Sequence, residues 1–218
     1  MTKKLTAILF SLFLIFSLVG CNKTEPISMN PINIDFNVKT VDNGTITFNY
    51  PIDEWEEASS FNPDLIKILL YPKNDLEKTT NITVGMTAES TNLTLDDYVK
   101  LLPSQLEKSS PGTKVTVAEL RKINDIEVSY IELNTKITEE AMEYGLQNGI
   151  FSQENIEALG GKEAFLNQPE KKQIQMSVSF NDRITNITGT YEDDKNRETV
   201  LKSMTTMVQT STLKQIIF

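Results

Sequence analysis

The sequence lacks histidine altogether and contains one cysteine, Cys21. The absence of imidazole excludes Ser-His-Asp and Cys-His catalysis, histidine-ligated metals and the commonest general base near neutral pH. A single thiol excludes an intramolecular disulfide and a cysteine-rich zinc site. The chain also has no Gly-rich phosphate loop and no Ser-x-x-Lys or Gly-x-Ser-x-Gly nucleophile motif. We therefore predict that the protein is not an enzyme and that it uses no cofactor and no metal.

Basic residues are scarce as well. The chain has 21 Lys and Arg against 30 Asp and Glu, which gives a formal net charge of −9. A surface of this sign repels the phosphate backbone of DNA and RNA. Nucleic acid is therefore excluded as a partner.

The acidic residues form several short clusters instead of one long run. Examples are Glu54 with Glu56 and Glu57, and the stretch from Glu192 to Asp194. Neighbouring acids at a turn or a helix start are usually solvated, and the second cluster lacks the loop spacing and turn glycine of a calcium site. A carboxylate-based hydrolase remains an alternative only if two such acids face each other across a cleft.

The first 20 residues have the pattern of a secretion signal. Lys3 and Lys4 precede an apolar or small-residue stretch at positions 5–18, which is shorter than the ~20 residues of a membrane span. The stretch ends in Leu-Val-Gly before Cys21, which resembles the bacterial lipobox, where the cysteine sulfur accepts a diacylglyceryl group. We expect residues 1–20 to be a signal peptide and Cys21 to be the lipid-bearing first residue of a protein held at the extracytoplasmic face of the cell membrane. Removal of the leader leaves 19 of the 21 basic residues against 30 acidic ones, a net charge of −11.

The mature chain divides into a short polar segment and one domain. Residues 21–33 contain Pro26 and Pro31 among polar residues, which predicts an extended tether. Residues 34–212 are long enough for one domain with its own core, followed by a tail at 213–218.

The domain begins with a predicted hairpin. Ile34, Phe36 and Val38 alternate with polar residues, positions 45–50 repeat the alternation, and Asn43-Gly44 between them favours a tight turn. Further strands are expected at 65–71, 81–88, 114–120, 127–134, 173–180 and 183–191.

Two longer helical patterns should cover the sheet, at positions 95–106 and 200–208. Thr94 and Asp97 predict a capping box at the first of them, and Pro103 predicts a kink or an early end. Residues 136–171 predict a short helical insertion between two neighbouring strands, with helix starts near Thr138 and Ser152. Its apolar residues are expected to pack back on the sheet as a lid, and the alternative is a surface that binds a partner.

Several of these features together resemble the PsbP-like family. They are the Phe48-Asn49-Tyr50-Pro51 strand end followed by Trp55, the helix at Leu95-Asp96-Asp97-Tyr98, the late hairpin at 173–191 and the closing helix near 200–208. The resemblance covers residues 34–212 and implies an α+β fold, an antiparallel sheet flanked by helices as an α/β/α sandwich, from which the insertion departs. The family is named for an extrinsic subunit of photosystem II and includes lipoproteins of unassigned role, so the resemblance implies fold more than activity. Metal-linked roles of photosynthetic members are not expected in a chain without histidine.

The sequence therefore predicts a surface-anchored lipoprotein whose non-catalytic domain supports or binds another envelope protein. The alternative is a carrier or sensor of a small ligand held in a pocket between sheet and helices. Trp55 is expected to be a core anchor, with ligand stacking as the alternative. Asn43, Asn81, Asn92 and Asn186 match the glycosylation acceptor pattern, which has meaning only if the source glycosylates such sites.

Overall fold

The structure, a computed structural model, describes residues 24–59, 66–85, 88–89, 93–180 and 183–213. The expected signal peptide and Cys21 lie outside these ranges. Within them, no helix has the length and apolarity that crossing a membrane requires.

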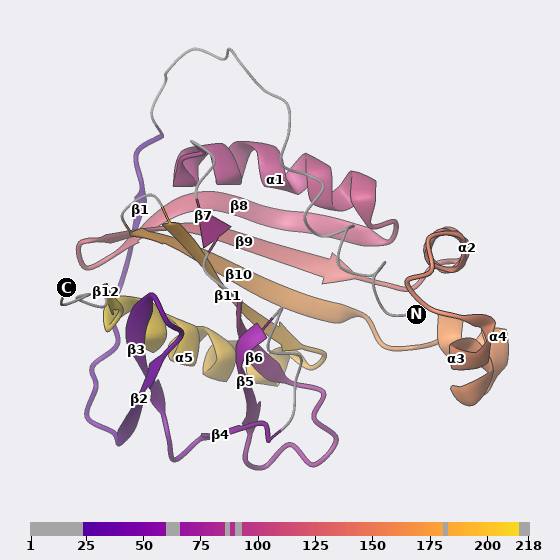
Figure 1. The fold of residues 1–218 in the computed structure, drawn as a ribbon, viewed down its shortest axis with the longest axis horizontal. Coiled ribbons are helices and arrows are strands. Elements are labelled where there is room, and N and C mark those ends of the chain that lie inside the picture. The colour runs from indigo at the N-terminus through magenta and orange to yellow at the C-terminus, as the bar shows by residue number, and fades with distance from the viewer. Residues whose placement is uncertain (1–23, 60–65, 86–87, 90–92, 181–182, 214–218) are drawn as a thin grey trace.

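A large, almost wholly antiparallel sheet forms the body of the protein (Figure 1). Its strand order is β1-β8-β9-β10-β11-β6-β5-β4, and β7 pairs separately with β11. Only β1 is parallel to its neighbour among the described strands. The strands are β1 (Ile27–Met29), β4 (Trp55–Glu57), β5 (Ile66–Pro72), β6 (Asn81–Gly85), β7 (Ala88–Glu89), β8 (Thr113–Ile123), β9 (Ile126–Thr135), β10 (Lys171–Phe180) and β11 (Arg183–Tyr191).

A second, three-stranded sheet has the order β12-β3-β2, with β2 (Val38–Asp42), β3 (Ile46–Pro51) and β12 (Thr212–Leu213). The predicted hairpin is confirmed: Gly44 has φ +96°, and Asn43 Oδ1 accepts hydrogen bonds from the amides of Thr45 and Ile46 at 3.0 and 2.9 Å. The predicted start of the first strand is wrong, because pairing begins at Val38 and not at Ile34.

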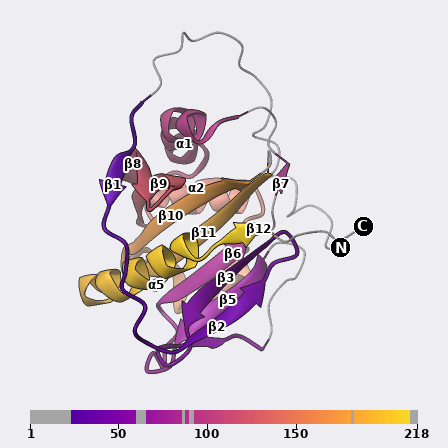
Figure 2. The same cartoon turned by 90° about the vertical axis from the view of Figure 1, so that its left-hand side faces the viewer.

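Two helices cover opposite faces of the large sheet, α1 (Leu95–Ser109) and α5 (Arg197–Gln209), the latter preceded by a short turn of 3₁₀ helix, η1 (Asp194–Asn196) (Figure 2). The expected α/β/α arrangement is confirmed, and β2, β3 and β12 add a layer beside α5. The capping box also forms, since Asp97 N donates to Thr94 Oγ1 at 3.1 Å and Thr94 N donates to Asp97 Oδ2 at 2.8 Å. The expectation of an early end at Pro103 is wrong: the contacts of α1 with β8 and β9 outweigh the loss of one backbone donor, and the helix runs to Ser109.

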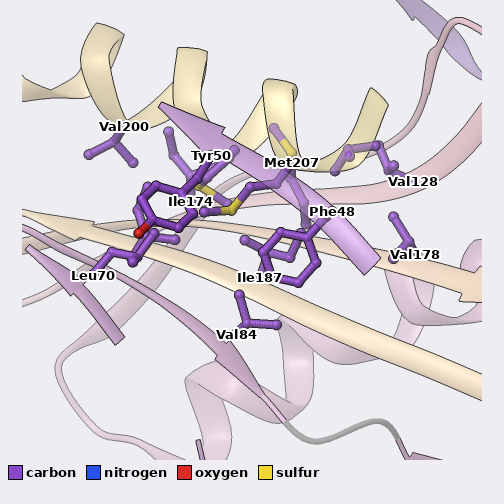
Figure 3. Close-up of a cluster of buried hydrophobic side chains, with 14 of the residues drawn as sticks. Phe48, Tyr50, Leu70, Val84, Val128, Ile174, Val178, Ile187, Val200 and Met207 are labelled. Atoms are coloured by element: carbon purple, nitrogen blue, oxygen red, sulfur yellow. The ribbon is translucent and has the colours of Figure 1, made fainter. Parts of the chain in front are cut away.

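The main core lies between the large sheet and the layer of α5 and β3 (Figure 3). Phe48 and Tyr50 of β3 point into it together with Val200 and Met207 of α5. Trp55 is fully buried, and its Nε1 donates to Ser203 Oγ at 2.7 Å. The structure therefore supports the core-anchor interpretation of this tryptophan.

The insertion lies where the sequence predicts it. Three helices, α2 (Glu139–Gln147), α3 (Gln153–Ala158) and α4 (Gly161–Leu166), separate β9 from β10. Those two strands pair directly, with Thr135 opposite Lys171 at the point where the insertion leaves the sheet. Figure 1 shows the three helices grouped beyond this end of the sheet, apart from both α1 and α5.

The segment expected to be a free tether is instead bound to the domain from Thr24 onward. Ile27–Met29 forms β1 against the edge strand β8, and the backbone of Ile32 is hydrogen-bonded to the side chain of Gln209. Pro26 and Pro31 flank the paired residues and do not interrupt them, which is why a strand can form between two prolines. The domain therefore starts about ten residues earlier than the expected boundary at 34. At the other end, β12 includes Leu213, one residue into the expected tail of 213–218, whose remaining residues lie outside the described ranges.

Candidate functional site

The helical insertion is a small unit with its own core. We call residues 137–166 the knob. Met142, Ile156 and Phe165, one from each helix, form a buried cluster that is separate from the main core. The residues packed around this cluster are Ile137, Leu146, Phe151 and Leu166. The expectation that these side chains pack back on the sheet as a lid is therefore wrong, because they cover one another.

Close packing inside the knob depends on a glycine. The rings of Phe151 and Phe165 meet edge to face with centroids 5.0 Å apart. Phe151 lies directly over Gly145, where a Cβ atom would come within 2.2 Å of the ring. Any larger residue at position 145 would displace the phenylalanine, so the knob has a defined interior.

Local signals in the sequence explain why the knob helices start where they do. Ala141 N donates to Thr138 Oγ1 at 3.1 Å at the start of α2. Ser152 and Asn155 form a reciprocal capping box at the start of α3. Both helix starts agree with the sequence prediction.

The outside of the knob is strongly acidic. All six of its glutamates are exposed, and its one base, Lys162, pairs with Glu139 at 2.8 Å. Six acids and one base give residues 137–166 a net charge of −5. Two large apolar side chains are exposed among these charges, Ile150 at 47% and Leu159 at 51%. The glutamates are Glu139, Glu140, Glu143, Glu154, Glu157 and Glu163.

Most acids of the clusters outside the knob are paired with lysines. Glu54 binds Lys202 at 2.6 Å, and Glu57 binds Lys39 at 2.9 Å while Glu56 lies exposed. In the other cluster, Asp193 binds Lys195 at 2.9 Å and Asp194 binds Lys172 at 2.7 Å. In the described part of the chain no three acidic or cysteine side chains are placed to hold a metal. This arrangement does not support the carboxylate-hydrolase alternative.

One polar network, which no local sequence pattern predicts, joins the sheet to α5. Tyr130 of β9 donates to Glu132, and Arg197 at the start of α5 donates to the same carboxylate oxygen. The guanidinium of Arg121 lies 3.5 Å from the centre of the Tyr130 ring. Burial, and then the bond to Glu132, raises the pKa of Tyr130 well above its ordinary value. Since one oxygen of the Glu132 carboxylate accepts from both a phenol and a guanidinium, the network joins α5 to the sheet.

The structure gives little support to a ligand held between sheet and helices, because the side chains of the main core are buried against one another. A surface pocket of about 550 Å³ lies near the start of α5, and a smaller one of about 330 Å³ lies at the base of the knob. The first is lined by both acids and lysines, including the bonded pair Glu54 and Lys202, and has no apolar interior of the kind that holds small ligands.

The four Asn-x-Thr positions differ in access. Asn43 is buried, and its side chain holds the hairpin turn, so it cannot accept a glycan in the folded protein. Asn81 is half-buried in β6 and Asn186 is exposed in β11. Asn92 lies outside the described residues.

No protein-family model matches the chain, and no curated protein sequence matches it. The fold is similar to several solved structures. LpqN of Mycobacterium tuberculosis, described as involved in cell envelope biogenesis, has 12% identity and a TM-score of 0.50 over 82% of this chain and 91% of that one. The Ran-binding protein Mog1p of Saccharomyces cerevisiae has 10% identity and a TM-score of 0.50 over 82% and 96%. Cyanobacterial PsbP (CyanoP) of Synechocystis sp. PCC 6803 has 11% identity and a TM-score of 0.48 over 81% and 92%. Identities of this size show the fold alone, and the fold shared with LpqN is PsbP-like, as the sequence resemblance implied.

Proposed function

We propose that this protein is a lipoprotein anchored through Cys21 at the extracytoplasmic face of the membrane, where its domain binds another protein of the cell envelope through the knob. The single observation that carries the binding role is the construction of the knob. It is a folded unit with its own core that stands beyond the end of the sheet and exposes both charge and apolar surface.

The chemistry of the knob favours a protein partner. A charge of −5 on 30 residues repels anionic lipids and nucleic acid and attracts a basic surface. The exposed Ile150 and Leu159 supply apolar area that can be buried in a contact, while the surrounding glutamates steer the encounter. The partner is therefore a protein with a basic patch that contains apolar residues.

Two further observations agree with the proposal, although its main argument is the structure of the knob. The run of apolar residues that ends in Leu-Val-Gly-Cys supports the anchor and the envelope location. The Ran-binding and cell-envelope descriptions of the two structural neighbours at a TM-score of 0.50 are in keeping with a binding role for this fold.

The experiment is photo-crosslinking in living cells from single positions. A photoreactive amino acid at Leu159 on the knob is compared with the same residue at Leu76, which is 93% exposed in the turn between β5 and β6. We expect one defined adduct from position 159 and none from 76, and we expect the adduct to disappear when Glu154, Glu157 and Glu163 are changed to Gln. Equal adducts from both positions, or an adduct that survives the three changes, would contradict a knob-directed contact.

A further inference from the structure

The N-terminal segment of the domain is held against the fold by contacts from several elements. We call residues 24–37 the latch. Its strand β1 pairs in parallel with β8, from Ile27 opposite Arg121 to Met29 opposite Ile123. Met29 also packs against the main core, and Arg121 Nη1 lies 3.8 Å from its sulfur.

Beyond β1 the latch is fixed again at two places. Gln209 of α5 bonds both the amide and the carbonyl of Ile32 at 2.8 Å. Phe36 lies under the ammonium of Lys202, 4.6 Å from the ring centre, and Asn37 Nδ2 donates to Asp53 at 2.8 Å. The path of the chain is therefore determined from β1 to the first strand of the small sheet.

The start of the latch lies beside the start of α1. Figures 1 and 2 both show the described residues that precede β1 running to the N-terminal end of α1. The interaction of Thr24 with Asp96, which helps to lower the pKa of that carboxyl, agrees with this position. The point at which the chain leaves the domain toward Cys21 is thus the N-terminal end of α1.

The chain between Cys21 and Thr24 is very short. Three residue steps span at most ~11 Å when fully extended. A domain of this size has a radius of gyration of about 16 Å. Because the tether is shorter than the domain is wide, the domain cannot turn freely against a surface to which Cys21 is fixed.

We propose that the surface around Thr24 and the N-terminal end of α1 faces the lipid bilayer at close range, and that the latch sets this orientation. The inference rests on the proposed lipid anchor at Cys21. The bilayer is the one occupant considered, because it is where the short tether must end. The chain that remains after residues 1–20 are removed has a net charge of −11, which disfavours anionic head groups, so we attribute the orientation to the tether and the latch and not to charge attraction.

This orientation places the knob away from the anchored end. Helix α1 begins beside Thr24, and the turn after it reaches the base of the knob, where Lys136 N donates to Gly112 O at 3.0 Å. Its 15 residues are ~22 Å long, about twice the reach of the tether. Figure 1 shows that β1 and the knob lie at opposite ends of the sheet. The binding surface of the proposed function is therefore directed away from the bilayer, toward partners in the envelope.

The test measures how close three positions lie to a bilayer. Cys21 is the only cysteine, and once lipidated it has no free thiol, so one introduced cysteine gives a single fluorescent label. The lipidated full chain carries Glu25→Cys at the start of the latch, Leu159→Cys on the knob or Leu76→Cys at the β5–β6 turn, in phosphatidylcholine vesicles that contain a head-group quencher. Glu25 is exposed beside Thr24. We expect quenching at position 25 to exceed that at 76 and 159 several-fold. Equal quenching at the three positions, or strongest quenching at 76 or 159, would overturn the proposal.

A variant with a longer tether tests whether the short tether sets the orientation of the domain. Ten Gly and Ser residues inserted between Lys23 and Thr24 add a flexible span of about 18 Å and leave every contact of the latch in place. We expect the differences among the three positions to collapse in this variant, and unchanged differences would overturn the role of the short tether. If the wild-type chain fails to stay on the vesicles, the lipid anchor itself is wrong, which overturns the proposed function as well. A chain that stays attached but shows no difference overturns the orientation alone.

Discussion

The side-chain amide of Gln209 closes a pair of hydrogen bonds on the backbone of Ile32, donating to its carbonyl and accepting from its amide, each at 2.8 Å. The two residues are 177 positions apart, so this contact ties the beginning of the domain to its last helix. It also explains why residues that look like a linker follow a fixed path.

Replacement of Gln209 by Ala should remove both bonds and loosen the latch. Two neutral hydrogen bonds contribute about 1–3 kcal/mol to stability. Their removal should destabilise mainly residues 24–33 and leave the stability of the rest of the domain almost unchanged. We expect faster hydrogen exchange in this segment with little change at β9 and β10. Gln209→Glu keeps an acceptor for the Ile32 amide, so its rate of hydrogen exchange in this segment should lie between those of the wild type and the Ala variant. Unchanged exchange in the Ala variant would show that β1 alone holds the segment.

The contact between the latch and α1 should weaken in acid. The hydrogen bond from Lys100 (2.6 Å) lowers the pKa of Asp96, and interaction with Thr24 lowers it further against an opposing effect of burial. A group whose pKa is lower in the folded protein stabilises the fold above its unfolded pKa of about 4, and that contribution is lost as the pH falls through the lowered value. We expect hydrogen-exchange protection at residues 24–29 to fall from about pH 6 to about pH 3 by more in the wild type than in Asp96→Asn. The same pH dependence in both proteins would contradict the role of this carboxylate.

The elements that sequence reasoning predicted well are those with local signals. The capping residues Thr94 and Ser152 and the turn at Asn43-Gly44 act within three or four positions, so their effects can be read from neighbours. The insertion was located for the same reason. The interior of the insertion was not predicted, because whether Phe151 packs on Gly145 or on the sheet depends on three-dimensional contacts.

The features that sequence reasoning missed depend on distant partners. β1 forms because the edge of β8 is available, and Ile32 is fixed by a side chain near the other end of the chain. The network of Tyr130, Glu132 and Arg197 joins a strand to a helix 65 positions away. The apolar alternation of Ile34 and Phe36 was misread as a strand, because these residues follow the path of the latch and not a neighbouring strand.

Close approach of α5 to the sheet at Gly189 predicts a specific sensitivity. A Cβ atom at Gly189 would lie 2.2 Å from Val200 Cγ1 and 2.7 Å from Met204 Sδ. Overpacking of this kind destabilises by about 1–3 kcal/mol, which for a domain of this size lowers the Tm by roughly 2–10 °C. Gly85→Ala is the matched control, since the nearest atom there is 3.7 Å away. Thermal melting of both variants checks the prediction, and equal Tm values would show that α5 can shift at little cost.

The knob should be removable without unfolding the domain. Replacement of residues 138–169 by a short Gly-Ser turn joins two strands that already pair, and a shorter loop is easier to close. We expect a Tm within a few degrees of the wild type, and loss of binding to the purified partner that the crosslink from position 159 identifies in the wild type. Phe165→Ala in the full chain is the companion variant: it should remove exchange protection from α2–α4 and leave that of β9 and β10 intact. Unfolding of the shortened protein would show that the knob belongs to the main core.

Acyl labelling of the single cysteine tests the central claim, that this domain works as a lipid-anchored protein, most directly. Cells that express the wild-type chain or Cys21→Ser are grown with an alkyne-labelled palmitate, and the protein is examined for label and size. We expect label and a processed chain that lacks residues 1–20 in the wild type, and an unlabelled, unprocessed or misprocessed chain in the variant. Equal labelling of the two proteins would contradict the anchor, and with it the envelope location and the orientation inferred from the short tether.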